Sequence, residues 1–194
     1  MGKMEQNREK KRRAILQAAE EIFLSEGYVD ANMDHISALA QVTKQTVYRY
    51  YPSKIELFKA TLQQMGQSDE MDFLSPLQLS DTKEALYQFA YGFIQAHLSQ
   101  KHLSTYRLLI ADSAKAPEIV KSFFDIGPND TDRQLKAFFS ERLGVEKPDS
   151  LVQLWTGMLL SHRSGILVGM PRPDDKELEQ YAQDATDFLL SAVA

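Results

Sequence analysis

Apolar residues recur at the spacing of one helix face along almost the whole chain. In the first stretch, Ile15, Ala18, Ala19, Ile22 and Phe23 follow the i, i+3, i+4, i+7 pattern of a helix with one buried face. Later stretches repeat the pattern between capping residues, glycines and prolines, and no alternating Val, Ile or Thr run typical of a strand stands out. The sequence therefore predicts an all-α fold of about nine to ten helices.

Turn and cap residues divide the chain into a small head and a larger bundle. A three-helix head is expected over residues 1–53, a connecting helix over 54–66, and a larger C-terminal helical bundle over 67–194. Residues 66–80 contain Ser, Asp, Gln and Pro76 without a sustained period, which is typical of a linker. The expected helices cover residues 7–26, 33–40, 44–51, 54–65, 82–98, 104–116, 117–126, 131–143, 150–169 and 175–193.

Several functional classes are disfavoured by composition and motifs. The chain has no cysteine, which excludes disulfides, thiol catalysis and cysteine-ligated metals. No P-loop, nucleophile elbow, dinucleotide-binding loop or HExxH motif appears. His97 and His102 are five residues apart, which is not the i, i+4 spacing of paired helical metal ligands. We therefore expect neither an enzyme nor a cofactor or metal site.

The chain also shows no targeting segment. No apolar stretch follows the N-terminal methionine, and the longest apolar run, 151–168, is interrupted by Gln153, His162 and Arg163. We expect this run to be a buried helix of a cytoplasmic protein that has no membrane partner.

The net charge of −5 is unevenly distributed. Residues 1–64 contain ten Lys and Arg against eight Asp and Glu, whereas the remaining residues contain twelve against nineteen. Five of the N-terminal cations lie between Arg8 and Arg13. A basic head on an acidic body is typical of a module that meets a polyanion, although solvated basic N-termini are also common.

Residues 33–51 form two short helical stretches joined by a tight turn, a helix-turn-helix pattern. Ile36 and Leu39 lie on the inner face of the first stretch, Val42 fills the turn and Val47 anchors the second. The outer side of the second stretch carries side chains that suit base edges and phosphates. These residues are Lys44, Gln45, Thr46, Tyr48, Arg49 and Tyr50. Helical hairpins also occur in proteins that bind nothing, so the pattern alone leaves both interpretations open.

Segment 13–65 resembles the DNA-binding head of the TetR family of bacterial repressors. The matching residues are Ile15–Ala19, Phe23, Gly27–Tyr28, Asp34–Ile36, Ala40–Thr43, Thr46–Tyr51 and Ser53–Phe58. The resemblance implies a homodimer with two domains, in which residues 67–194 bind a small effector and control the grip of residues 1–53 on double-stranded operator DNA.

The resemblance also implies roles for individual residues. Tyr48 and Lys54 match the usual phosphate contacts of the family. Lys44, Gln45, Thr46, Arg49 and Tyr50 match the surface that faces the groove. We expect the basic run from Arg8 to Arg13 to lie near the DNA backbone and to add affinity that does not depend on sequence.

Four positions depart from the family pattern. Gln41 stands where the family often has glycine in the turn, and a positive φ there costs a non-glycine residue about 1 kcal/mol. Ala31 stands where threonine is common, so Asn32 must cap the second helix. Tyr50-Tyr51 replaces the usual His-Phe. These departures bear on the operator sequence.

Small residues recur at every fourth position of the expected helix 150–169. Gly157, Ser161, Gly165 and Gly169 form this stripe, which would let another backbone approach closely. Ala182, Thr186 and Leu189 of the last helix offer a complementary face. The sequence predicts a homodimer through these residues, as the family resemblance also implies, and packing within a monomer is the alternative.

Residues 87–163 are rich in aromatic and polar side chains that could line an effector pocket. The candidates are Phe93, His97, Tyr106, Phe123, Trp155, Met158 and His162. The pair His162-Arg163 interrupts an apolar helix and suits an acidic effector, a carboxylate across the dimer, or a solvated face.

We therefore expect a ligand-responsive DNA-binding transcriptional regulator, a repressor released from its operator by a small molecule. The alternative is a helical small-molecule-binding protein or enzyme with a vestigial head. A third candidate, a DNA-packaging protein, would bind duplexes without regard to sequence.

Overall fold

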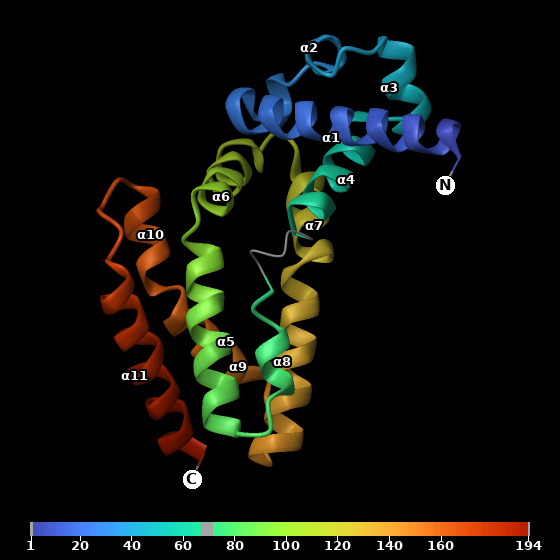
Figure 1. Ribbon diagram of the computed structural model, residues 1–194. Helices are drawn as coiled ribbons and strands as arrows, with labels where there is room; N and C mark the ends of the chain where they lie inside the picture. Colours follow the sequence, from blue (N-terminus) through green and yellow to red (C-terminus); the bar gives the residue numbers. More distant parts are fainter. Residues whose placement is uncertain (1, 67–71, 194) are drawn as a thin grey trace. The chain divides into compact units, whose positions relative to one another are not determined.

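The computed structural model describes residues 2–66 and 72–193, and these residues form helices and turns without a strand (Figure 1). The all-α prediction is confirmed. The elements are α1 (Lys3–Asp30), α2 (Met33–Leu39), α3 (Lys44–Tyr50), α4 (Lys54–Gly66), the 3₁₀ turn η2 (Ser75–Gln78), α5 (Thr82–His97), α6 (Gln100–Asp112), α7 (Pro117–Ile126), α8 (Pro128–Leu143), α9 (Asp149–Leu159), α10 (Ser161–Leu167) and α11 (Asp175–Val193).

Side-chain caps explain why several helices begin where the sequence predicts. Asn32 Oδ1 accepts a hydrogen bond from the Asp34 amide at 2.8 Å, and Asp81 Oδ1 accepts one from the Glu84 amide at 2.9 Å. Thr43 Oγ1 accepts from the Thr46 amide at 3.2 Å. Each cap satisfies an amide that lacks a partner within its own helix.

Several helices differ from the prediction in their bounds or their interior, and α1 and α8 begin early, at Lys3 and Pro128. The expected helix 150–169 is broken at Leu160, because the Tyr181 hydroxyl donates to the Met158 carbonyl at 2.8 Å. This side chain from α11 takes a carbonyl that an unbroken helix would use itself. Helix α6 begins four residues early, because Ser99 Oγ accepts from the His102 amide at 3.2 Å. The linker 66–80 contains the η2 turn, and its residues 67–71 lie outside the described ranges.

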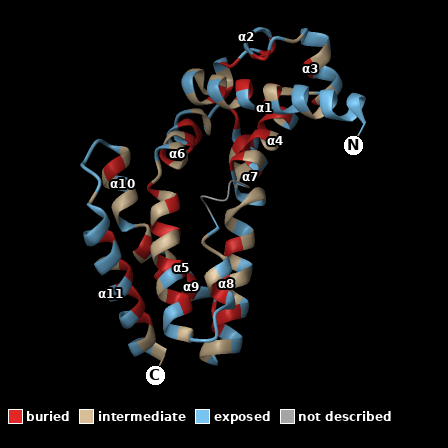
Figure 2. Ribbon diagram, viewed as in Figure 1, coloured by how far each residue is buried: buried red, intermediate tan, exposed pale blue. Residues whose placement is uncertain are grey.

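The described chain packs into two compact units. Unit 1 comprises Met1–Gln67 and Ser104–Gly127, and unit 2 comprises Ser68–Leu103 and Pro128–Ala194. The packing units therefore differ from the predicted division 1–53, 54–66 and 67–194, which remains a prediction about functional domains. The reason is that Leu108 and Ile119, from α6 and α7, are buried in the same core as residues of α1 and α4. Figure 2 shows buried segments of α1, α4 and α6 in red.

An aromatic cluster lies at the centre of unit 1. The ring of Phe58 meets Phe23 and Tyr28 edge-on, each at a centroid distance of 5.1 Å. Ile36 of α2 and Val47 of α3 are fully buried in this core. The helix-turn-helix is therefore held on α1 by apolar contacts that leave one side of α3 outside.

Unit 2 is built around α5, which packs against α11, η2 and α9. A continuous series of aromatic contacts runs through its core. Phe89 stacks on Phe93 at 5.3 Å and on Trp155 at 5.6 Å, and Trp155 also contacts Phe139. The buried Trp155 indole N–H donates a hydrogen bond to the Ala185 carbonyl of α11 at 3.1 Å, so the polar atom of this ring has a partner in the core.

Candidate nucleic-acid interface

The outer face of α3 carries the predicted groove-facing residues. Val47 is fully buried beneath the helix, whereas Lys44, Gln45 and Arg49 are exposed. Tyr48 keeps 42% of its surface accessible, which is high for an aromatic residue, and Thr46 and Tyr50 are half-buried. One short helix thus presents aromatic, polar and cationic groups on a side that no core residue covers.

The turn before α3 has the positive φ that the sequence analysis considered at Gln41. Gln41 has a φ of 54° and is the non-glycine residue with positive φ among the described residues. This left-handed conformation costs a residue with a side chain about 1 kcal/mol. The tight turn is therefore made in spite of Gln41, and the neighbouring Thr43 cap and buried Val47 compensate for it.

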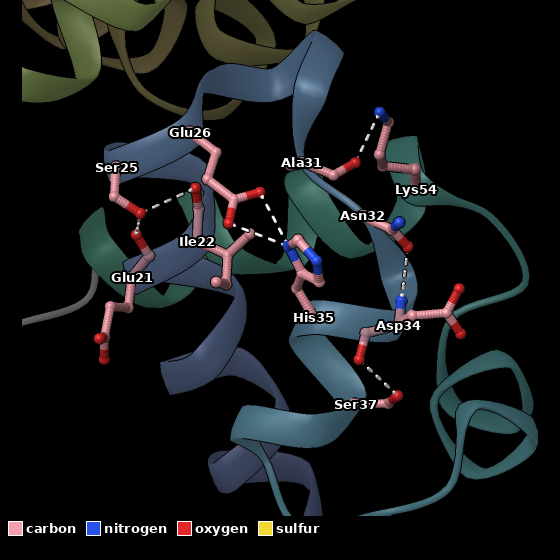
Figure 3. A network of polar contacts seen from close by, with 10 residues as sticks. All are labelled: Glu21, Ile22, Ser25, Glu26, Ala31, Asn32, Asp34, His35, Ser37 and Lys54. Atoms are coloured by element: carbon pink, nitrogen blue, oxygen red, sulfur yellow. Dashed lines mark hydrogen bonds and ion pairs between the residues drawn. The ribbon is translucent and has the colours of Figure 1, made fainter.

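Polar contacts link α2 to both neighbouring helices, and Figure 3 shows the contact with α1. His35 Nδ1 lies 3.0 Å from Glu26 Oε1 of α1. Lys44 Nζ donates to Asp34 Oδ2 at 2.8 Å, and this hydrogen bond raises the pKa of Lys44. The charge of Lys44 is therefore already matched by a carboxylate within the head.

The ammonium group of Lys54, a predicted phosphate contact, forms hydrogen bonds within the protein. Its ammonium donates to the carbonyl oxygen of Ala31 at 3.0 Å (Figure 3). It also donates to the carbonyl oxygen of Val29 at 2.9 Å and lies 4.8 Å from the centre of the Tyr28 ring. Burial lowers the pKa of this lysine. Lys54 thus fastens α4 to the junction of α1 and α2, and its contact with phosphate remains a prediction.

Asp112, at the end of α6, holds the same junction from the other side. Its Oδ2 accepts hydrogen bonds from the amides of Tyr28 at 2.7 Å and Val29 at 3.0 Å. Gly27 makes this approach possible, because a Cβ at that position would lie 2.9 Å from the same oxygen. Sequence analysis missed Asp112, and the glycine at position 27 is the local signal of an unusual backbone at its contact.

The predicted pocket residues lie in different surroundings. Phe93 and Trp155 are buried within the aromatic series of unit 2, and His162 packs against Tyr181 at 4.8 Å. Met158 is half-buried on α9. Tyr106 and Phe123 belong to unit 1, where their rings meet edge-on at 5.9 Å. An effector site made of these residues remains a prediction.

A pair of half-buried histidines, His97 and His102, lies beside Phe93 in unit 2. The ring of His97 lies 3.9 Å from Phe93 and 4.4 Å from His102. Burial, the neighbouring His102 and then Arg163 lower the pKa of His97 to about 3, and burial and Arg163 lower the pKa of His102 to about 4. Both rings are therefore neutral near pH 7, and His97 Nδ1 donates to the Phe93 carbonyl at 2.8 Å.

This pair predicts that stability falls on mild acidification. Histidines in the unfolded chain take up protons as the pH falls through about 6.5, whereas the folded pair does so only near pH 4 and below. We expect the free energy of unfolding in urea to drop by about 3–4 kcal/mol from pH 7 to pH 5, about half of it from each histidine. His102→Gln should reduce this dependence, and equal stability of the wild-type chain at both pH values would refute it.

The predicted dimer residues of α11 need correction. Ala182, Thr186 and Leu189 are at most 1% exposed, because this face of α11 packs on α5 within the same unit. They are core residues and are not available to a second subunit. The outward side of α11 instead presents Phe188, which is 61% exposed.

The stripe of small residues also divides into two groups. Gly165 and Gly169 serve the end of α10: a Cβ on Gly165 would meet Met170 Sδ at 2.9 Å, and Gly169 has a φ of 100°. Gly157 and Ser161 are exposed, and a Cβ on Gly157 would meet nothing within 4 Å. Only these two members therefore remain available for a close approach by another chain.

The exposed side of α3, its buried anchor and the preceding turn define a helix-turn-helix protein of the DNA-binding class. Residues 15–61 match the family model described as bacterial regulatory proteins, tetR family. Residues 84–192, more than half of the chain, match the AefR-like transcriptional repressor C-terminal domain. The chain belongs to the TetR family of bacterial transcriptional regulators.

Curated relatives are similar mainly in the head. The chain is 35% identical over 78 residues to the regulator SrpR of Pseudomonas putida, a match that covers 40% of this chain and 37% of SrpR. It is 43% identical over 56 residues to the activator FasR of Mycolicibacterium smegmatis, covering 29% of this chain and 26% of FasR. The matches thus span well under two thirds of these relatives.

Solved structures resemble the chain over nearly its full length. The Flavonoid-responsive Regulator FrrA has a TM-score of 0.75 at 25% identity, with 94% of this chain and 96% of that chain covered. A TetR family regulator from Pseudomonas syringae pv. tomato has a TM-score of 0.73 at 23% identity, with the same coverage. Within the described ranges, no helix is both long and apolar enough to cross a membrane.

Proposed function

We propose that this protein is a homodimeric transcriptional repressor that reads operator DNA with α3 and is released by a small molecule bound in unit 2. The observation that carries the proposal is the uncovered polar face of α3, held by the buried Val47. Its membership of the TetR family supports the same function. Selection of bound duplexes from a random-sequence library tests it directly, because a DNA-packaging protein would enrich no sequence and a vestigial head would retain no duplex.

Base reading and backbone contact predict different outcomes for neighbouring residues of α3. Gln45→Ala should lose about 1–3 kcal/mol on the selected duplex and relax preference at one or two base pairs, because an amide recognises base edges. Tyr48→Phe should weaken all duplexes equally, because a phosphate contact carries no sequence information. Binding titrations on the selected and a scrambled duplex measure both effects. An unchanged sequence preference in Gln45→Ala would contradict its assignment.

We infer that the dimer forms through the exposed sides of α9 and α11. Leu154 on α9 is 69% exposed and Phe188 on α11 is 61% exposed, and Gly157 lies one turn beyond Leu154. Glycine in a helix interior costs about 1 kcal/mol relative to alanine. Among the described residues, no atom lies within 4 Å of a Cβ built on Gly157, so close approach of a second copy supplies a reason for this glycine.

Helix α6 supports a route by which an effector would control the head. Its first residues, including His102, belong to unit 2, and its last residue, Asp112, holds the α1–α2 junction in unit 1. A small molecule that binds unit 2 more tightly when α6 is displaced would release that junction and weaken DNA binding. In this proposal α6 links the two units, in addition to the connecting helix expected over residues 54–66.

The aromatic series of unit 2 suits an apolar, aromatic effector, and the name of the similar FrrA points to the same class. Trp155 is the single tryptophan of the chain and lies within this series, so its emission reports binding there. Flavonoids and smaller aromatic acids should be titrated while Trp155 emission and duplex release are followed together. Ligands that change the emission in stoichiometric amounts without ever releasing DNA would refute the proposed coupling.

A further inference from the structure

The basic residues around α3 differ in how much of their charge is already used. Lys44 is paired with Asp34 at 2.8 Å, and Lys54 donates to two backbone carbonyls. Arg12 of α1 lies 3.5 Å from Glu9. In the described part of the chain, no carboxylate pairs with Arg8 or Arg49. The guanidinium groups of Arg8 and Arg49 therefore have no carboxylate partner among the described residues.

Arg8 and Arg49 share one recess with Tyr50. It has a volume of about 250 Å³ and is lined by these three residues. The Tyr50 hydroxyl donates to the Arg8 carbonyl at 3.3 Å, which ties the early part of α1 to the end of α3. The Arg49 guanidinium lies 5.8 Å from the centre of the Tyr50 ring, so the ring helps to orient it. A contact between distant parts of the chain thus assembles the recess.

The chemistry of the recess selects a particular class of ligand. Guanidinium groups bind tetrahedral oxyanions through paired N–H donors, and phosphate is the form in which they meet nucleic acids. The volume is several times the ~30 Å³ that one water molecule occupies in the liquid, so a phosphate group has room. Arg49 lies in the last turn of α3, where the helix dipole stabilises a positive charge. This effect does not explain why the Arg8 guanidinium lies in the same recess.

We propose that Arg8 and Arg49 together form a seat for one backbone phosphate of the bound duplex. The inference rests on the proposed DNA-binding function and refines it in two respects. It gives Arg8 of α1 a defined contact, and it moves Arg49 from the groove-reading set to the backbone-contacting set. The site fixes the register of the head on the duplex and carries no base preference.

The test compares Arg8→Gln and Arg49→Gln with Lys10→Gln in the full-length chain. Lys10 is an exposed cation of α1 that lies two residues from Arg8, which places it on another side of the helix. Each arginine variant should reduce the affinity for DNA about tenfold, equally on the selected and scrambled duplexes. The slope of the logarithm of the binding constant against the logarithm of the salt concentration should become smaller in magnitude by about 1. Lys10→Gln should show a clearly smaller change in both quantities.

A shared phosphate makes a further demand on the two variants. When single phosphates of the selected duplex are replaced by neutral methylphosphonates in turn, one position should abolish the effect of both substitutions. The proposal is overturned if no such position exists, if Arg8→Gln behaves like Lys10→Gln, or if Arg49→Gln changes base preference with an unchanged salt slope. Failure of the wild-type chain to bind any duplex would instead refute the proposed function itself.

Discussion

The double variant Leu154→Glu/Phe188→Glu should be a folded monomer at concentrations at which the wild-type chain is a dimer. Full burial of a leucine or phenylalanine side chain contributes about 1.5–3 kcal/mol, and a symmetric interface buries each of them twice. Buried carboxylates in their place would lack partners. We therefore expect the dimer dissociation constant to rise by more than about 1,000-fold, as measured by sedimentation equilibrium.

Two comparison variants make this result specific to the α9–α11 surface. Ile110→Glu introduces the same charge at another apolar residue, 60% exposed on α6, and should leave assembly unchanged. Gly157→Leu should keep the thermal stability of the protomer, because its new side chain enters open space, yet should hinder the dimer. A monomeric wild-type chain at micromolar concentration, or a dimeric double variant, would refute the proposed interface.

Gly27→Ala should destabilise unit 1 by about 2–4 kcal/mol. Gly27 has φ 83° and ψ 172°, a backbone region that is almost reserved for glycine. In addition, the new Cβ would lie 2.9 Å from Asp112 Oδ2, so the carboxylate must withdraw from the amides of Tyr28 and Val29. Urea unfolding followed by circular dichroism measures the loss.

Gly144 and Asp112 provide the controls for this second prediction. Gly144 also has a positive φ, 69°, but a Cβ there would meet nothing within 4 Å, so Gly144→Ala should cost only the backbone term of about 1 kcal/mol. In an Asp112→Ala background, the penalty of Gly27→Ala should shrink, because the oxygen that it strikes is gone. Equal losses for Gly27→Ala and Gly144→Ala would show that the contact with Asp112 contributes nothing.

Some features of the structure follow from neighbouring residues in the sequence, whereas others depend on contacts between distant residues. The caps at Asn32, Thr43 and Asp81 and the buried Val47 each depend on a few neighbouring residues, and the structure shows all four. The contact between Asp112 and the amide of Tyr28 joins residues 84 positions apart. No periodicity or motif links positions so distant, and one sequence offers no second signal.

The faces of α11 show why the dimer prediction was partly wrong. An apolar stripe must be buried, but its composition does not say whether its own chain or a second copy covers it, because both provide the same apolar surroundings. In the structure, Ala182 and Leu189 of α11 are buried where α11 packs against α5, whereas Phe188 of the same helix is exposed to solvent. The break at Leu160 has a similar origin, since the Tyr181 hydroxyl that causes it comes from another helix.

The sequence by itself determined the all-α class, most helix boundaries and the helix-turn-helix with its outward residues, because caps, turns and helical periodicity act over a few residues. Only the tertiary structure decided which helices share a core and that Arg8 lies beside Arg49. It also decided which backbone groups form hydrogen bonds with the ammonium of Lys54 and the carboxylate of Asp112. These features depend on contacts between segments far apart in the chain. Their partners are selected by the packing of whole helices, which no local pattern encodes.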